Sequence, residues 1–267
     1  MFKSQAGAGL VAALAWASAA PAQSQDEPIR DNSFLVEEAY NQEHGVVQHV
    51  STLLDFQDEP QWTASFTQEW PLFGPRHQLS YTLAWAGLGE ARGRGDAALH
   101  YRWQLLGVEG GRVAFAPRLS LLVPSGDAGD GLGAGSPGVQ VNLPVSVELG
   151  ARWVGHWNVG GTWTPGAEAR DGAEADAGAL QLGQGLVYLL RPRLNLLLEA
   201  VYARGRSVRE GGGTERVEEL HLSPGLRWAL NRPGGLQVVP GIAVPVGVGP
   251  SNGEWSLFVY LSFEHPF

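Results

Sequence analysis

The pair His221 and Ser223 is the clearest candidate for covalent chemistry in the sequence. Side chains alternate faces along a strand, so a base and a hydroxyl two residues apart would lie on the same face. Lipid-hydrolysing enzymes of the outer membrane use a His-x-Ser pair of this kind, but there an Asn follows the serine, whereas Pro224 follows Ser223 here. Neither an accompanying acid nor an oxyanion-hole donor is identifiable. We therefore expect no enzyme, and keep lipid hydrolysis by His221 and Ser223 as an alternative.

A larger set of ionisable and amide side chains could bind a solute or line its path. These residues alternate with apolar ones, so elements with a period of two would collect them on one side. The set is His49, Asp55, Glu69, His100, Arg102, Arg118, Glu148, Arg152, His156, Asn158, Arg193, Glu199, His221, Arg227 and Glu264.

Alternating segments that would position these residues recur along the chain. The clearest runs from Val139 to Leu149, where all odd positions are aliphatic and the even positions are Gln140, Asn142, Pro144, Ser146 and Glu148. Alternation of this kind is typical of strands and not of helices. Twelve strands are predicted, at 46–56, 61–71, 76–87, 95–106, 112–123, 138–149, 151–163, 179–190, 193–203, 217–230, 235–247 and 255–267.

The predicted connections sort by length. Short ones follow the even-numbered strands, at 73–75, 107–111, 150, 191–192 and 231–234. Longer hydrophilic ones follow strands three, five, seven and nine, at 88–94, 124–137, 164–178 and 204–216. Short turns at one end and long loops at the other are typical of outer-membrane β-barrels, which have an even number of antiparallel strands.

Composition and charge exclude several other classes of protein. The formal net charge of −9 disfavours nucleic acid as a partner. The absence of cysteine rules out disulfides, thiol catalysis and Cys-ligated metals. A mean hydropathy of −0.10 is too polar for a helical membrane protein but ordinary for a barrel, in which only alternate residues meet lipid.

Both ends of the sequence favour export to the outer membrane. Residues 1–22 have the features of a signal peptide, with Lys3, a short apolar run and the Ala20-Pro21-Ala22 cleavage site. The last strand alternates and stops on an aromatic residue, so Phe263 and Phe267 are predicted to act as its assembly signal.

Residues 23–45 differ from the barrel predicted over 46–267. Ser33 could cap a helix, the apolar spacing that follows is helix-compatible, and Gly45 could end it. We expect either a short helix in the barrel mouth, acting as a plug, or an ordered lead-in to the first strand.

Two stretches resemble a known family. They are residues 31–49, Asp31-Asn-Ser-Phe-Leu-Val-Glu-Glu-Ala-Tyr-Asn-Gln-Glu43 with Gly45-Val-Val-Gln-His49, and residues 121–138, Leu121-Leu-Val-Pro-Ser-Gly126 with Gly131-Leu-Gly-Ala-Gly-Ser-Pro-Gly138. Both are similar to outer-membrane proteins of the phenol-degradation meta-pathway family of transporters. The resemblance implies a barrel that passes small, often aromatic or apolar molecules, and it brings no catalytic residues.

The sequence therefore predicts an all-β protein, a twelve-stranded antiparallel transmembrane β-barrel in the bacterial outer membrane. An arginine on the lipid side costs about 2–4 kcal/mol at mid-membrane, so we expect the ionisable set to point inward. Either it lines a pore or pocket, or it pairs into a closed polar core and the barrel is structural. The expected partners are outer-membrane lipids and lipopolysaccharide, the barrel-assembly machinery and a small-molecule solute, with no cofactor and no metal.

Overall fold

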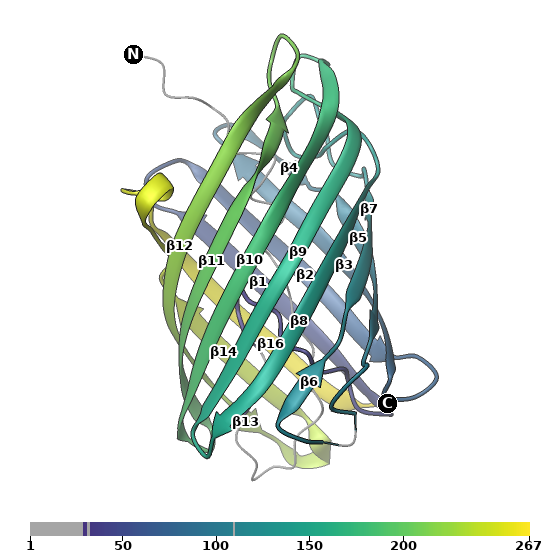
Figure 1. The fold of residues 1–267 in the computed structure, drawn as a ribbon, viewed down its shortest axis with the longest axis vertical. Coiled ribbons are helices and arrows are strands. Elements are labelled where there is room, and N and C mark those ends of the chain that lie inside the picture. Colours follow the sequence, from purple (N-terminus) through teal and green to yellow (C-terminus); the bar gives the residue numbers. More distant parts are fainter. Residues whose placement is uncertain (1–28, 31–32, 109) are drawn as a thin grey trace.

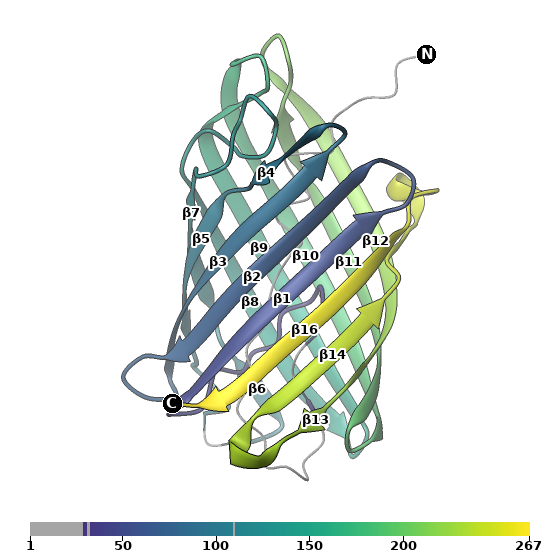
Figure 2. The same ribbon diagram turned by 180° about the vertical axis from the view of Figure 1, so that it is seen from behind.

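The computed structural model describes residues 29–30, 33–108 and 110–267, and its strands form one antiparallel sheet closed on itself (Figures 1 and 2). Its first and last long strands pair, with Val46 opposite Pro266 and Phe56 opposite Ser256. The strand segments are β1 (Val46–Phe56), β2 (Gln61–Pro71), β3 (His77–Leu88), β4 (Ala91–Arg94), β5 (Ala97–Trp103), β6 (Val113–Phe115), β7 (Arg118–Val123), β8 (Gly138–Gly150), β9 (Trp153–Glu168), β10 (Glu174–Arg191), β11 (Leu194–Val208), β12 (Thr214–Trp228), β13 (Leu230–Asn231), β14 (Gln237–Ala243), β15 (Val246–Gly247) and β16 (Ser256–Pro266).

Four strands of the barrel are interrupted, so that β4 with β5, β6 with β7, β12 with β13, and β14 with β15 each count once. The barrel therefore has twelve strands, and the sequence prediction of this fold is confirmed. Pro117 and Pro245 lie at two of the interruptions, where a residue without an N–H cannot continue the ladder. The only helices in the described ranges are the short 3-10 turns η1 (Pro233–Gly235) and η2 (Gly249–Ser251).

The two faces of the wall differ as the alternation predicts. Along β8, Val139, Val141 and Leu143 are exposed on the outside, whereas Gln140 and Asn142 are buried inside. The same outward face carries exposed indoles at or next to strand ends, at Trp103, Trp153, Trp228 and Trp255, and a further one within β9, at Trp163. Within the described residues, no helix has the length and apolar character needed to cross a membrane.

The connections differ from the prediction at both ends. The strands β9, β10, β11 and β12 run well beyond their predicted limits, so the connections there are only 169–173 and 209–213. At the opposite end, where Phe267 lies, one connection extends over 104–112 and is not short. Ladder hydrogen bonds that continue through Gly, Asp and Glu residues explain the first difference, because these residue types resemble loops in sequence. We call the end with Phe267 the turn end and the other the loop end.

Residues 33–42 lie inside the barrel, and residues 33–45 contain no helix. We call residues Ser33–Gln42 the inner segment, since all of them except the half-buried Tyr40 are buried. Of the two alternatives for this stretch, the short helix is wrong for a physical reason: side chains of the wall, and not carbonyls one turn earlier, accept most of the hydrogen bonds of this backbone. Gly45, with φ of +78°, then turns the chain into β1 in a conformation that favours glycine.

Candidate functional site: the lumen and its inner segment

The first part of the inner segment packs on an apolar patch of the wall. The Phe34 ring lies 5.4 Å from that of Phe258 and 5.2 Å from that of Tyr260, both on β16. Val36 lies against Gly183 and Gly185 of β10, where an added Cβ would already be in contact with it. Burying these side chains removes apolar surface from water, which favours this position of the segment by about 1.5–3 kcal/mol for each large side chain.

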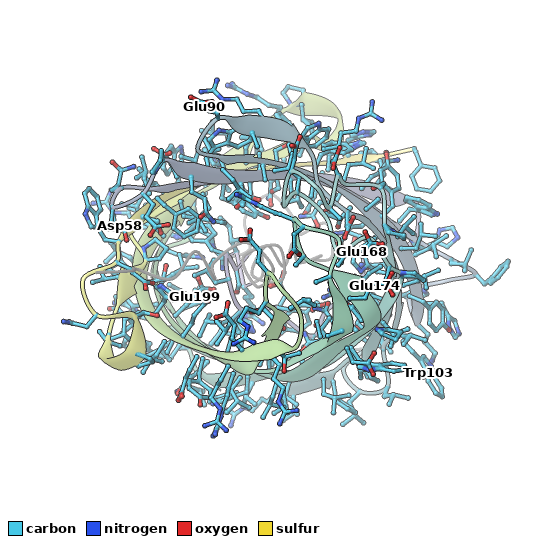
Figure 3. All side chains as sticks on the ribbon, turned by 90° about the horizontal axis from the view of Figure 1, so that it is seen from above. Asp58, Glu90, Trp103, Glu168, Glu174 and Glu199 are labelled. Carbon is cyan, nitrogen blue, oxygen red and sulfur yellow. The ribbon has the colours of Figure 1, made fainter. Side chains whose placement is uncertain are left out.

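The carboxylate of Glu199, on β11, binds the backbone of this first part of the inner segment, Phe34–Val36. It accepts N–H groups from Phe34 at 3.0 Å, Leu35 at 3.1 Å and Val36 at 3.2 Å. Successive backbone N–H groups that converge in this way form an anion-binding concavity. In Figure 3, a view along the barrel, Glu199 lies within the ring of strands and Trp103 outside it.

Glu37 is the centre of the polar part of the inner segment. Its Oε1 pairs with Nη2 of Arg102, and its Oε2 lies 3.3 Å from Nη2 of Arg118 and 2.6 Å from Nδ2 of Asn142. All four side chains are buried. Charge-assisted hydrogen bonds of this kind are roughly twice as strong as neutral ones.

Two amide side chains of the wall each bind the backbone of the segment twice. Asn158 accepts the N–H of Glu37 at 2.7 Å and donates to its carbonyl at 2.7 Å. Gln104 accepts the N–H of Asn41 at 2.7 Å and donates to the carbonyl of Ala39 at 2.6 Å. These bonds reproduce what a neighbouring strand would provide, but they come from side chains.

The contacts continue to the end of the segment. Arg102 Nη1 donates to the carbonyl of Tyr40 at 2.8 Å. Gln78 accepts the N–H of Gln42 at 2.7 Å and donates to Glu69 at 2.9 Å. The wall therefore binds the inner segment from Phe34 to Gln42, and the segment takes part in no strand ladder.

Most of the predicted lumen residues point inward. Those buried inside the barrel are Glu69, His100, Arg102, Arg118, His156, Asn158, Glu199, Arg227 and Glu264. Two more lie on the inward face but are only partly buried: Glu148, which pairs with Arg30, and His221, which lies toward the loop end.

Four predictions of inward-facing residues are wrong. His49 is on the outer face of β1, where its ring stacks on those of Phe66 and His265. Asp55 shares that face, because its inward neighbours on β1 are Leu54 and Phe56. Arg152 and Arg193 lie exposed in the turns 151–152 and 192–193, where a cation is solvated without entering the lumen.

His221 and Ser223 both face inward, as the hydrolase alternative requires, but they are not hydrogen-bonded to each other. His221 Nε2 lies 3.2 Å from Oε2 of Glu254, whereas Ser223 Oγ is buried without a hydrogen-bond partner in the part of the chain that the structure describes. A hydrolase needs its base hydrogen-bonded to the nucleophile.

The predicted assembly residues lie outside the lumen. Phe263 is on the outer face of β16, and Phe267 is exposed at the turn end.

Two features of the site were not predicted from the sequence: Glu37, which organises these residues, and the inward glycines that make room for Phe34. Gly241 and Gly225 face Phe34 so closely that an added Cβ would clash with its ring. A glycine at an inward-facing position of a strand often marks a place where another part of the chain approaches closely. This is the signal in the sequence that could have predicted the contact.

A wall of this kind, apolar outside and polar inside around a buried segment, defines a transmembrane-type β-barrel. No family model and no curated protein matches the chain. The structure resembles that of the COG4313 outer membrane channel from Pseudomonas putida F1, with a TM-score of 0.65 and 14% identity over 86% of this chain and 98% of that one. It also resembles the NanC porin, with a TM-score of 0.56 and 5% identity over 82% of this chain and 100% of that one. At these identities the likeness shows the outer-membrane barrel fold.

Proposed function

We propose that the protein is an outer-membrane channel for small molecules and that the inner segment obstructs its lumen. One observation carries this proposal: a buried segment lies inside the barrel and is held by side chains of the wall. Since no strand ladder includes the segment, its release would leave all pairings of the barrel intact. A removable obstruction is what a closed channel requires.

The structures that this fold resembles support the proposal, because they are described as an outer membrane channel and a porin. The resemblance of residues 31–49 and 121–138 to the phenol-degradation meta-pathway family favours small aromatic or apolar solutes. The exposed apolar band of the outer face supports a position among outer-membrane lipids, with the turn end in the periplasm.

A structural barrel with a closed polar core is the second candidate. It is favoured by the density of contacts around Glu37, which fill this part of the lumen. The two candidates differ in what remains when the inner segment is removed. A channel then has an open lumen, whereas a closed core stays closed because the wall residues pair with one another.

Removal of residues 26–44 tests the proposal. The full chain and the shortened chain are reconstituted in planar bilayers, after heat-modifiable migration on gels has shown that both form barrels. We expect a conductance several times larger without the segment, since the channel cross-section is no longer obstructed. If the shortened barrel stays closed, the structural candidate is correct. In liposome-swelling assays the shortened protein should admit small neutral and aromatic solutes and refuse sugars larger than a disaccharide.

A further inference from the structure

Two arginines face each other directly on the inner wall. Arg102 of β5 and Arg118 of β7 are cross-strand partners, and they are only 1% and 5% exposed. Like charges directly opposite on one face of a sheet are destabilising, and a buried charge costs much more when no opposite charge accompanies it. The pair therefore requires an anion.

The inner segment supplies this anion through Glu37. One carboxylate oxygen pairs with Arg102, and the other binds Arg118 and Asn142, at 3.3 Å and 2.6 Å. Asn158 holds the backbone of Glu37 at both its N–H and its carbonyl, which fixes where the carboxylate lies. The positive groups belong to the wall, whereas the negative group belongs to the segment.

When the inner segment leaves, the ionisable groups that remain around Arg102 and Arg118 carry a net positive charge. Glu69 of β2 is the nearby carboxylate of the wall, and its Oε2 accepts a hydrogen bond from Gln78 at 2.9 Å. His100 is bound to Thr82 and Ser120, and Glu38 leaves with the segment. Two guanidinium groups then face one carboxylate.

We propose that Arg102, Arg118 and Asn142 form a binding site for the carboxylate group of a small organic acid, and that Glu37 occupies this site while the lumen is obstructed. This inference rests on the proposed function, of which it names the substrate class. Two oxygens in one plane, one on each arginine, match a carboxylate in the way that Glu37 does. A solute with this group competes with Glu37 and so favours release of the segment, because it binds only the released state.

Calorimetric titration of the detergent-solubilised full-length protein with benzoate tests the site, and benzyl alcohol serves as the neutral probe of similar size. The variant Glu37→Gln lacks the competing carboxylate, so it should bind benzoate about tenfold more tightly than the unaltered protein. Adding Arg118→Gln to this variant should abolish the gain. Adding Arg152→Gln, which alters an arginine in an exposed turn, should leave it unchanged. Benzyl alcohol should distinguish none of these proteins.

Equal benzoate affinity with and without Arg118, or equal binding of benzoate and benzyl alcohol, would overturn the proposal. Should Glu37→Gln not form a barrel, the unaltered protein decides in planar bilayers: benzoate must raise its conductance and benzyl alcohol must not. The two proposals fail separately. If the shortened chain conducts but the full-length protein does not bind benzoate, the channel proposal stands and the carboxylate site is wrong. If benzoate binds but the shortened chain does not conduct, the carboxylate site stands and the channel proposal is wrong.

Discussion

The two halves of the inner segment are held in different ways. The side chains of Phe34, Leu35 and Val36 pack in an apolar cluster and their N–H groups share one carboxylate, that of Glu199. Glu37 and the residues that follow are instead hydrogen-bonded one by one to separate side chains of the wall. Apolar contact is non-directional and tolerates small displacements. Hydrogen bonds and ion pairs fix a register, and a group left without its partner is costly. We infer that the apolar half gives the segment affinity for the wall, and that the polar half sets its position and dominates the cost of release.

The largest effect is expected for Glu37→Ala. It leaves Arg102 and Arg118 opposite each other without the anion between them, which should weaken the bound position of the segment by about 3–5 kcal/mol. The open fraction measured from single-channel records should rise accordingly. Glu59→Ala removes a carboxylate from an exposed connection at the loop end and is the matched control. An unchanged open fraction for Glu37→Ala would show that the polar half does not dominate.

A smaller effect is expected when the apolar half is disturbed through Gly241→Ala. The added methyl group would clash with the Phe34 ring, and such overpacking costs about 1–3 kcal/mol. Gly161→Ala is the control, because a Cβ at this strand position meets only Ala179 O at an ordinary 3.6 Å. The temperature at which the segment is released should be lower for Gly241→Ala than for Gly161→Ala. Near-ultraviolet circular dichroism, to which the packed rings of Phe34 and Tyr260 contribute, measures this temperature. If they behave alike, the packing around Phe34 is not tight.

The smallest effect concerns a contact outside the lumen and serves as a reference for both halves. Asp171 accepts N–H groups from Gly211 at 2.6 Å and Ala173 at 3.1 Å, and these bonds hold its pKa below the ordinary value of 3.8. A lowered pKa stabilises the folded contact above the ordinary pKa, and this contribution is lost as pH falls through the lowered one. The protection factor of the Gly211 amide, which compares its exchange with that of an unstructured amide at the same pH, should therefore fall only in acid. Asp171→Asn should lower this protection at neutral pH while conductance stays the same.

The barrel was largely predictable from sequence because lipid outside and polar groups inside impose alternation, as in Val139–Leu149. The bounds of β1 were predicted, but its faces were not, because Val50 and Leu54 point inward and remove the contrast between the faces. His49 and Asp55 were misplaced for this reason. The role of Glu37 was not predictable either, since its partners Arg102, Arg118 and Asn142 lie far away in sequence and carry no local signal.

The pairing of β1 with β16 has a consequence for the order of assembly. This seam joins the two most distant strands of the chain, and contacts between distant residues form late because closing a long loop costs entropy. The inner segment is joined to β1 through Gly45, whose carbonyl accepts the N–H of Phe267 at 3.0 Å. We therefore expect the segment to be drawn inside as the seam closes. Until that moment the nascent sheet carries two opposed arginines without their anion, which gives the last step of assembly an electrostatic driving force as well as an apolar one.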